Sequence, residues 1–250
     1  MKIKTLVFML CTLPGMAFSD ASVTVYTGVA DPSQGQPAQV LSHIKDMRQM
    51  MAESALIRHS WAPGTLITVP AATPQAQQQY VHLQNQLKAW AATESGDTGQ
   101  TINNVIRQLQ GVRVIGRQFT SMDADLILNN NAANRRLQGE YSVFVTTRPD
   151  KVLLLGAISG AGKQPWVAGR SVSEYLADHQ FLSGANRNNA VVIDADGTVR
   201  IAPVAYWNQH HVEAQPGSVI WVGFSHWTLP RQYKNLNQDI ISVLTHRVPE

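Results

Sequence analysis

The chain has 250 residues, with 20 lysines and arginines against 17 aspartates and glutamates, and a formal net charge of +3 at pH 7. So small a charge excludes the strongly basic surface with which proteins attract nucleic acids. Beyond the N-terminus no apolar run reaches the roughly 20 residues that a membrane-spanning helix needs. We therefore expect no transmembrane segment in the mature chain.

The first residues, 1–19, have the pattern of a secretory signal peptide. Two lysines precede an apolar run, and the segment ends in small residues where a signal peptidase cuts, although a cut after Ala21 also fits. Its loss lowers the net charge by 2, to +1. The one cysteine, Cys11, lies in this run without the small residues that lipidation requires. An exported chain without disulfides suits a bacterial periplasm.

The mature chain begins with strand-like sequence that two amphipathic helices interrupt. Residues 22–26 alternate as a strand does, and residues 40–51 carry apolar side chains at helical spacing. Apolar positions three or four apart over 73–92 and 102–109 predict two further helices. A short polar turn joins these two, and strand-like sequence lies on both sides. We therefore predict a helical hairpin, residues 73–110, inserted in a β-containing domain.

The remaining elements repeat the combination of strands with one helix. The segments VRVIGRQFT, DADLIL and YSVFVTT predict strands before a short linker, and KVLLLGAIS opens a second unit. Ser171 and Glu174 have the spacing of a capping box at a helix start. Two strands flank the hairpin turn Asp194–Gly197, and GSVIWVGF is the last strand. An amphipathic helix follows Pro230, and its apolar stripe docks either on the protein's own body or in a partner's groove.

These elements predict an α+β protein of two small sheets in tandem. We place the first domain at residues 22–149, with the helical-hairpin insertion, and the second domain at residues 150–228. The C-terminal amphipathic helix takes residues 229–250.

The glycine-rich stretch LLLGAISGAGKQPWVAGRSVSEYL superficially matches a nucleotide-binding loop. However, Ala157 stands at the first glycine position and Gln164 at the position of the metal-binding hydroxyl, which argues against ATP. The stretch resembles the soluble-ligand-binding β-grasp module. In that module Gly156, Gly160 and Gly162 serve tight turns, where other residues would be strained.

Over its mature length the chain is similar to the GfcC-type capsule-biosynthesis family. The segments that carry this resemblance include WAPG, VIGRQ, LQGEYSVFV, APVAYWNQHHVEAQPGS and SVLTHRVPE, in matching order. The resemblance implies two β-grasp domains, a hairpin inserted in the first, and likeness to the periplasmic domains of the polysaccharide exporter Wza. It implies a periplasmic protein encoded with export machinery, with no enzymatic activity and no cofactor.

Arg117 is the first candidate ligand-binding residue. The resemblance places it in a cleft of the first domain, where a guanidinium can form two parallel hydrogen bonds with a sugar carboxylate or phosphate. The alternative is a structural ion pair with Asp123, Asp125 or Glu140.

Tryptophans are the second kind of candidate. Trp166 and Trp207 flank turns and can stack on sugar rings, whereas Trp90 lies on an apolar helical stripe and is expected in the core. His210 and His211 lack the spacing of a zinc site, so no metal is expected.

The resemblance therefore implies a non-enzymatic accessory protein of capsule or exopolysaccharide export that binds acidic polysaccharide, outer-membrane export proteins, or both. One alternative is a pure assembly factor whose ligand is another protein. The other is a polysaccharide-modifying enzyme that uses Asp123, Asp125 or Glu140, because paired carboxylates hydrolyse glycosides.

Overall fold

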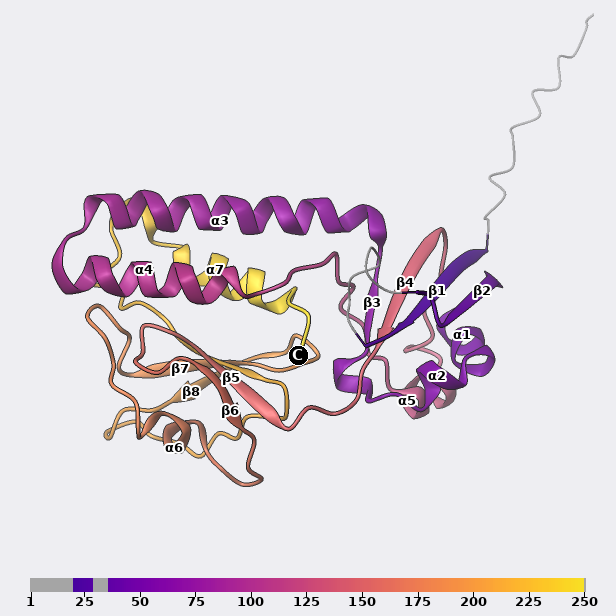
Figure 1. The fold of residues 1–250 in the computed structure, drawn as a ribbon. Helices are drawn as coiled ribbons and strands as arrows, with labels where there is room; N and C mark the ends of the chain where they lie inside the picture. Colours follow the sequence, from indigo (N-terminus) through magenta and orange to yellow (C-terminus); the bar gives the residue numbers. More distant parts are fainter. Residues whose placement is uncertain (1–19, 29–35, 250) are drawn as a thin grey trace, which may run out of the picture.

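The structure is a computed structural model that describes residues 20–28 and 36–249. The predicted signal peptide, residues 1–19, lies outside the described residues. The described residues form two mixed β-sheets with helices packed against them (Figure 1). This arrangement confirms the predicted α+β class.

The first sheet has four strands in the order β2-β1-β4-β3. They are β1 (Ala21–Thr27), β2 (Gln39–Ile44), β3 (Leu66–Thr68) and β4 (Glu140–Val145). β1 is parallel to β4, and the pairs β1 with β2 and β3 with β4 are antiparallel. The inward side chains of β1 alternate with half-buried ones, as its sequence predicts.

Short helices cover one face of this sheet. They are α1 (Met47–Glu53), α2 (Ala55–Arg58) and α5 (Ala124–Asn129), and their buried apolar side chains share one core with β1 and β4. Three 3-10 turns lie elsewhere, at Ala62–Gly64, Pro70–Ala72 and Arg231–Tyr233.

Three predictions for this part of the chain are wrong. The predicted helix over 40–51 is strand β2 followed by α1, which begins only after Asp46 caps it. The predicted strand DADLIL is helix α5, because the Asp123 carboxylate accepts hydrogen bonds from the N–H groups of Asp125 and Leu126. The predicted strand VRVIGRQFT forms only isolated bridges, at Val114 and Arg117.

The second sheet has five strands in the order β6-β5-β9-β7-β8. They are β5 (Lys151–Gly156), β6 (Gly162–Pro165), β7 (Asn189–Ile193), β8 (Val199–Pro203) and β9 (Val219–Val222). β5 is parallel to β9, and the other neighbours are antiparallel. The predicted β7–β8 hairpin is confirmed.

Helix α6 (Val172–Leu176) lies on one side of this sheet (Figure 1). The predicted capping box is present, because Ser171 Oγ accepts from the Glu174 N–H and the Glu174 carboxylate accepts from the Ser171 N–H.

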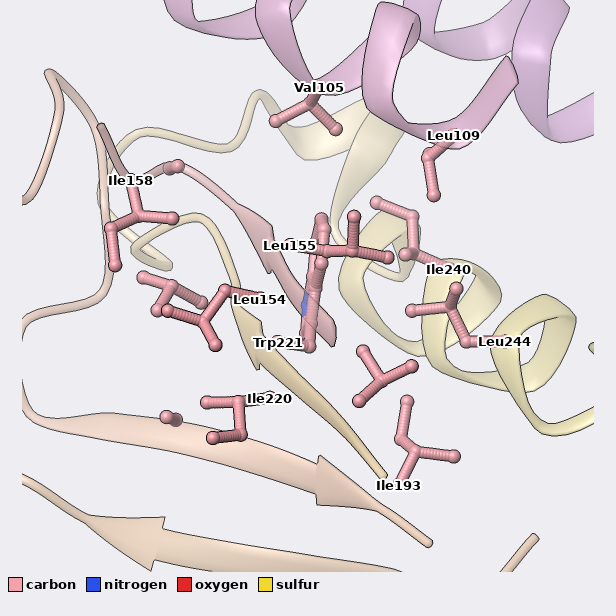
Figure 2. Close-up of a cluster of buried hydrophobic side chains, with 14 of the residues drawn as sticks. Val105, Leu109, Leu154, Leu155, Ile158, Ile193, Ile220, Trp221, Ile240 and Leu244 are labelled. Atoms are coloured by element: carbon pink, nitrogen blue, oxygen red, sulfur yellow. The ribbon is translucent and has the colours of Figure 1, made fainter. Parts of the chain in front are cut away.

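The helical hairpin, α3 (Thr73–Thr93) and α4 (Gly96–Gln110), lies between β3 and β4 in the chain but packs on the second sheet. Figure 1 shows it with α7 (Leu236–Thr245) on the side of the sheet opposite α6. Figure 2 shows side chains of α4 and α7 meeting Trp221 and Leu155 of the sheet. Trp90 is fully buried in this core, as predicted.

Helix α7 docks on the protein's own body, which decides between the two alternatives for its apolar stripe. Leu236, Ile240 and Leu244 are all buried in the core that the hairpin and the second sheet share. No helix in residues 20–28 and 36–249 is long and apolar enough to cross a membrane.

The three glycines singled out in the sequence all have positive φ: +113° for Gly156, +62° for Gly160 and +144° for Gly162. A Cβ at Gly156 would also overlap the carbonyl oxygen of Val222 in β9. At this position two backbones approach each other so closely that only glycine fits.

Candidate functional site

Arg117 is a buried cation that connects the two halves of the molecule. Its side chain is 7% exposed, and its Nη1 donates a hydrogen bond of 2.8 Å to the carbonyl of Ala195, in the turn between β7 and β8. The guanidinium also lies 5.6 Å from the centre of the Phe119 ring. Burial lowers the pKa of Arg117 to about 10, against the opposing influence of Asp196. Arg117 therefore remains charged at neutral pH.

A cleft of about 660 Å³ lies beside Arg117. The described residues that line it include two cations, Arg117 and Arg135, and two acids, Asp123 and Asp196, so its charge is balanced. Among the described residues, the guanidinium is hydrogen-bonded to a backbone carbonyl and not to Asp123, Asp125 or Glu140. In place of the alternative, an ion pair with one of those acids, Arg117 contacts the turn between β7 and β8.

A second cleft, of about 900 Å³, opens where the chain passes from β4 to β5. We call it the basic cleft. Among residues 20–28 and 36–249, the permanent charges that line it are three cations, Arg148, Lys151 and Lys163, and one acid, Asp150. Because its low-dielectric walls carry an excess of one sign, the basic cleft attracts anions.

Trp61 forms part of the wall of the basic cleft. Its half-buried ring lies so close to Gly64 that a Cβ there would overlap it, and a Cβ at Gly217 would be 3.5 Å from it. Trp61 thus belongs to the first half of the chain and reaches the loop that leads into β9. An indole held rigidly in this way offers a flat surface to a ligand.

Trp166 lies next to the basic cleft. The guanidinium of Arg148 is 4.9 Å from the centre of the Trp166 ring, a cation–π arrangement. The Trp166 indole N–H donates to the carbonyl of Ala214 at 2.9 Å, and its backbone N–H donates to the backbone carbonyl of Asp150 at 2.7 Å. Trp166 therefore orients Arg148, which in turn lines the basic cleft.

Trp207 lies apart from these residues. It is 74% exposed in the loop after β8, next to Tyr206, which is 99% exposed. The structure places Arg117 in one cleft, Trp166 beside another and Trp207 on an open loop, so the three predicted residues do not form one site.

Sequence reasoning did not select Arg148, Lys151 and Lys163. They lie in the linker and on the first two strands of the second unit, where cations are ordinarily solvated. Their position near the boundary of the two predicted units could have identified them as candidates, since ligand sites occur preferentially at such junctions.

Asp123 and Asp125, which were proposed as paired enzyme carboxylates on one strand, do not lie on a strand. Asp123 caps α5, and both Asp125 and Glu140 are exposed. His211 contacts Glu213 at 2.9 Å. The part of the chain that the structure describes contains no cluster of three or more His, Cys, Asp or Glu side chains suited to a metal ion.

The fold and clefts define an α+β protein with two mixed sheets and an anion-attracting cleft at their junction. The family model for capsule biosynthesis GfcC, N-terminal, matches residues 19–148, and the model for capsule biosynthesis GfcC C-terminal matches residues 160–249. The chain belongs to the GfcC capsule-biosynthesis family, which confirms the resemblance. It is 41% identical over 194 residues to YjbG, an uncharacterized protein of Escherichia coli strain K12, covering 78% of this chain and 79% of YjbG.

Proposed function

We propose that this protein is a non-enzymatic periplasmic accessory protein of capsule or exopolysaccharide assembly and export, and that it binds an acidic glycan in the basic cleft. Membership of a capsule-biosynthesis family supports the process. The observation that carries the binding role is the cleft itself, where three permanent cations and one acid of the described part of the chain line about 900 Å³ of space. The N-terminal signal pattern supports the periplasmic location.

The residues of the basic cleft suit both chemical features of an acidic glycan. Arg148 offers two parallel N–H groups to a carboxylate, and Lys151 and Lys163 supply positive point charges. The Trp61 ring offers an apolar face to the C–H side of a sugar. A cleft of this size lies within the range of sites for small ligands.

We also propose that both units are β-grasp domains, with the boundary between them at residues 149 and 150. Two features support this proposal for the second unit: its first strand β5 lies parallel to its last strand β9, and α6 follows β6. In the first unit β1 likewise lies parallel to the last strand, β4. On this assignment the basic cleft lies at a domain junction.

The test is a titration of the mature protein with fragments of the host's acidic polysaccharide, read by calorimetry and tryptophan fluorescence. We expect saturable binding that weakens as salt rises, because exposed charge interactions are screened. Lys151→Glu should weaken binding by about tenfold or more, since it replaces attraction by repulsion. Lys88→Glu, on the exposed side of α3, is the matched charge control. Dextran, a neutral glycan, is the ligand control.

If the folded protein shows no binding in this titration, the glycan-binding role is wrong. The alternative, a pure assembly factor for the outer-membrane exporter, would then be favoured. An enzyme would instead shorten or modify the glycan with time, which size-exclusion chromatography of the same mixtures detects.

A further inference from the structure

A narrow apolar slot adjoins the basic cleft. It has a volume of about 230 Å³ and lies between the C-terminal end of α4 and strands β5 and β6. Alternate residues of β5, Leu153 and Leu155, are on the sheet face toward α4, and Figure 2 shows Leu155 beneath Leu109 of that helix. Val112, Val152, Ala161 and Val248 add to the apolar lining, and the polar residues Gln108, Arg113 and Arg247 also line the slot.

One end of the slot is fixed by hydrogen bonds. The Gln108 side chain donates to the carbonyl of Gly156 at 3.1 Å and accepts from its N–H at 2.7 Å, which ties α4 to the end of β5. Lys151 and Lys163 line both the slot and the basic cleft. The two spaces therefore meet at a pair of cations.

We propose that the ligand is an anionic amphiphile, a sugar phosphate that carries an alkyl chain, as at the lipid-linked end of a glycan. Its phosphate would bind between Lys151 and Lys163, its sugars would extend into the basic cleft, and its chain would enter the slot. The inference rests on the proposed function, because it specifies the chemistry of the glycan that the basic cleft binds.

The chemistry of the lining supports this occupant. Alkyl groups gain free energy on leaving water in proportion to the apolar area buried, and most of the slot's lining is apolar, with Arg113 and Arg247 as further cations in its wall. Its volume equals that of roughly eight water molecules, enough for a short alkyl segment. An apolar side chain of a protein partner would not use the two cations at the mouth, whereas a phosphate next to an alkyl chain uses both features.

The experiment compares three probes by calorimetry, all below their critical micelle concentrations: octyl phosphate, ethyl phosphate and octyl glucoside. We expect octyl phosphate to bind at least about tenfold more tightly than ethyl phosphate, since several methylene groups are buried. It should also bind more tightly than octyl glucoside, which lacks the charge. Ala161→Phe fills the slot and should remove the advantage of the longer chain. Val167→Phe adds the same ring at a position that is 49% exposed and should leave it intact.

Equal affinities for octyl and ethyl phosphate, or a chain effect that survives Ala161→Phe in folded protein, would overturn the inference. Octyl glucoside binding as tightly as octyl phosphate would also overturn it, because the slot would then accept any apolar group. These results leave the polysaccharide titration untouched, so the two proposals fail separately. Lys88→Glu again provides the control for surface charge.

Discussion

At the scale of single residues, Gly156 and Gly162 allow the free-energy cost of backbone strain to be distinguished from the cost of steric overlap. Both have positive φ, but a Cβ at Gly156 overlaps the backbone of Val222, whereas a Cβ at Gly162 meets nothing within 4 Å. We predict that Gly162→Ala costs about 1–3 kcal/mol from backbone strain alone. Gly156→Ala should cost at least 1–3 kcal/mol more, because β5 and β9 must separate. Urea denaturation measures both, and equal losses would contradict the overlap.

Arg117 permits a test that distinguishes its structural contact from ligand binding. Arg117→Ala removes the hydrogen bond to the Ala195 carbonyl and leaves that acceptor buried without its donor. We predict a loss of about 1–3 kcal/mol in unfolding free energy and unchanged affinity for acidic glycan. Urea denaturation and the polysaccharide titration are run on the same samples. Weakened glycan binding in a protein of parental stability would instead identify the Arg117 cleft as the binding site.

At the scale of elements, the cap of α6 gives stability a dependence on pH. Hydrogen bonds from the Ser171 side chain and backbone lower the pKa of Glu174 below its ordinary value of 4.5. Because the folded state holds the charged form, this contribution is present above the unfolded pKa and is lost as pH falls through the lower, folded pKa. We predict that Ser171→Ala lowers the melting temperature at pH 7 and that the deficit shrinks as pH falls below 4.5. Calorimetry from pH 7 to pH 3 tests this, and a deficit independent of pH would refute it.

Replacing Trp90 tests how much the packing of the helical hairpin on the second sheet contributes to stability. Its ring is fully buried and packs edge-to-face on Phe224, with ring centres 4.8 Å apart. We predict that Trp90→Ala destabilises the protein by about 3–5 kcal/mol. Trp227, which is 99% exposed, is the matched control, and Trp227→Ala should change stability by less than about 0.5 kcal/mol. Similar losses in the two variants would mean that the hairpin is only loosely docked.

Sequence periodicity identified most elements but not where they pack. Strands β1, β4 and β9 were predictable because their apolar runs are short and rich in β-branched and aromatic residues. The run DADLIL was not, since its aliphatic end, Leu126 to Leu128, suits a strand until the cap at Asp123 is considered. The stripes of α3 and α4 gave no indication of which sheet they cover, because an apolar stripe fits any apolar face.

The clefts were less predictable than the fold for the same reason. Arg148 and Lys163 are 15 positions apart in the sequence and meet only because β6 folds back on β5. A buried arginine such as Arg117 stands out in a sequence only by its neighbours, which give no sign that its partner is the Ala195 carbonyl. The composition of the clefts therefore depends on contacts between residues far apart in the sequence, which local sequence patterns do not predict.

At the scale of the whole molecule, the two halves of the chain share one large core. Side chains of α3 and α4, which precede β4, pack with Leu155 and Trp221 of the second sheet and with α7. The second sheet therefore depends on a hairpin from the first part of the sequence. Further contacts join the two parts of the chain, among them the hydrogen bond from Arg117 to the β7–β8 turn and the hydrogen bond from the Val248 N–H to the carbonyl of Arg113.

Because the α3–α4 hairpin packs on the second sheet, we predict that the second unit does not fold alone. A fragment of residues 150–250 keeps all five strands of the second sheet and α7 but loses the hairpin that covers Trp221. The exposed apolar face removes much of the burial that offsets chain entropy. We expect this fragment to lack near-ultraviolet circular dichroism and to show no cooperative urea transition, whereas residues 20–250 show both. A sharp transition with a native-like tryptophan signal in the fragment would mean that the hairpin only decorates a sheet that is stable without it.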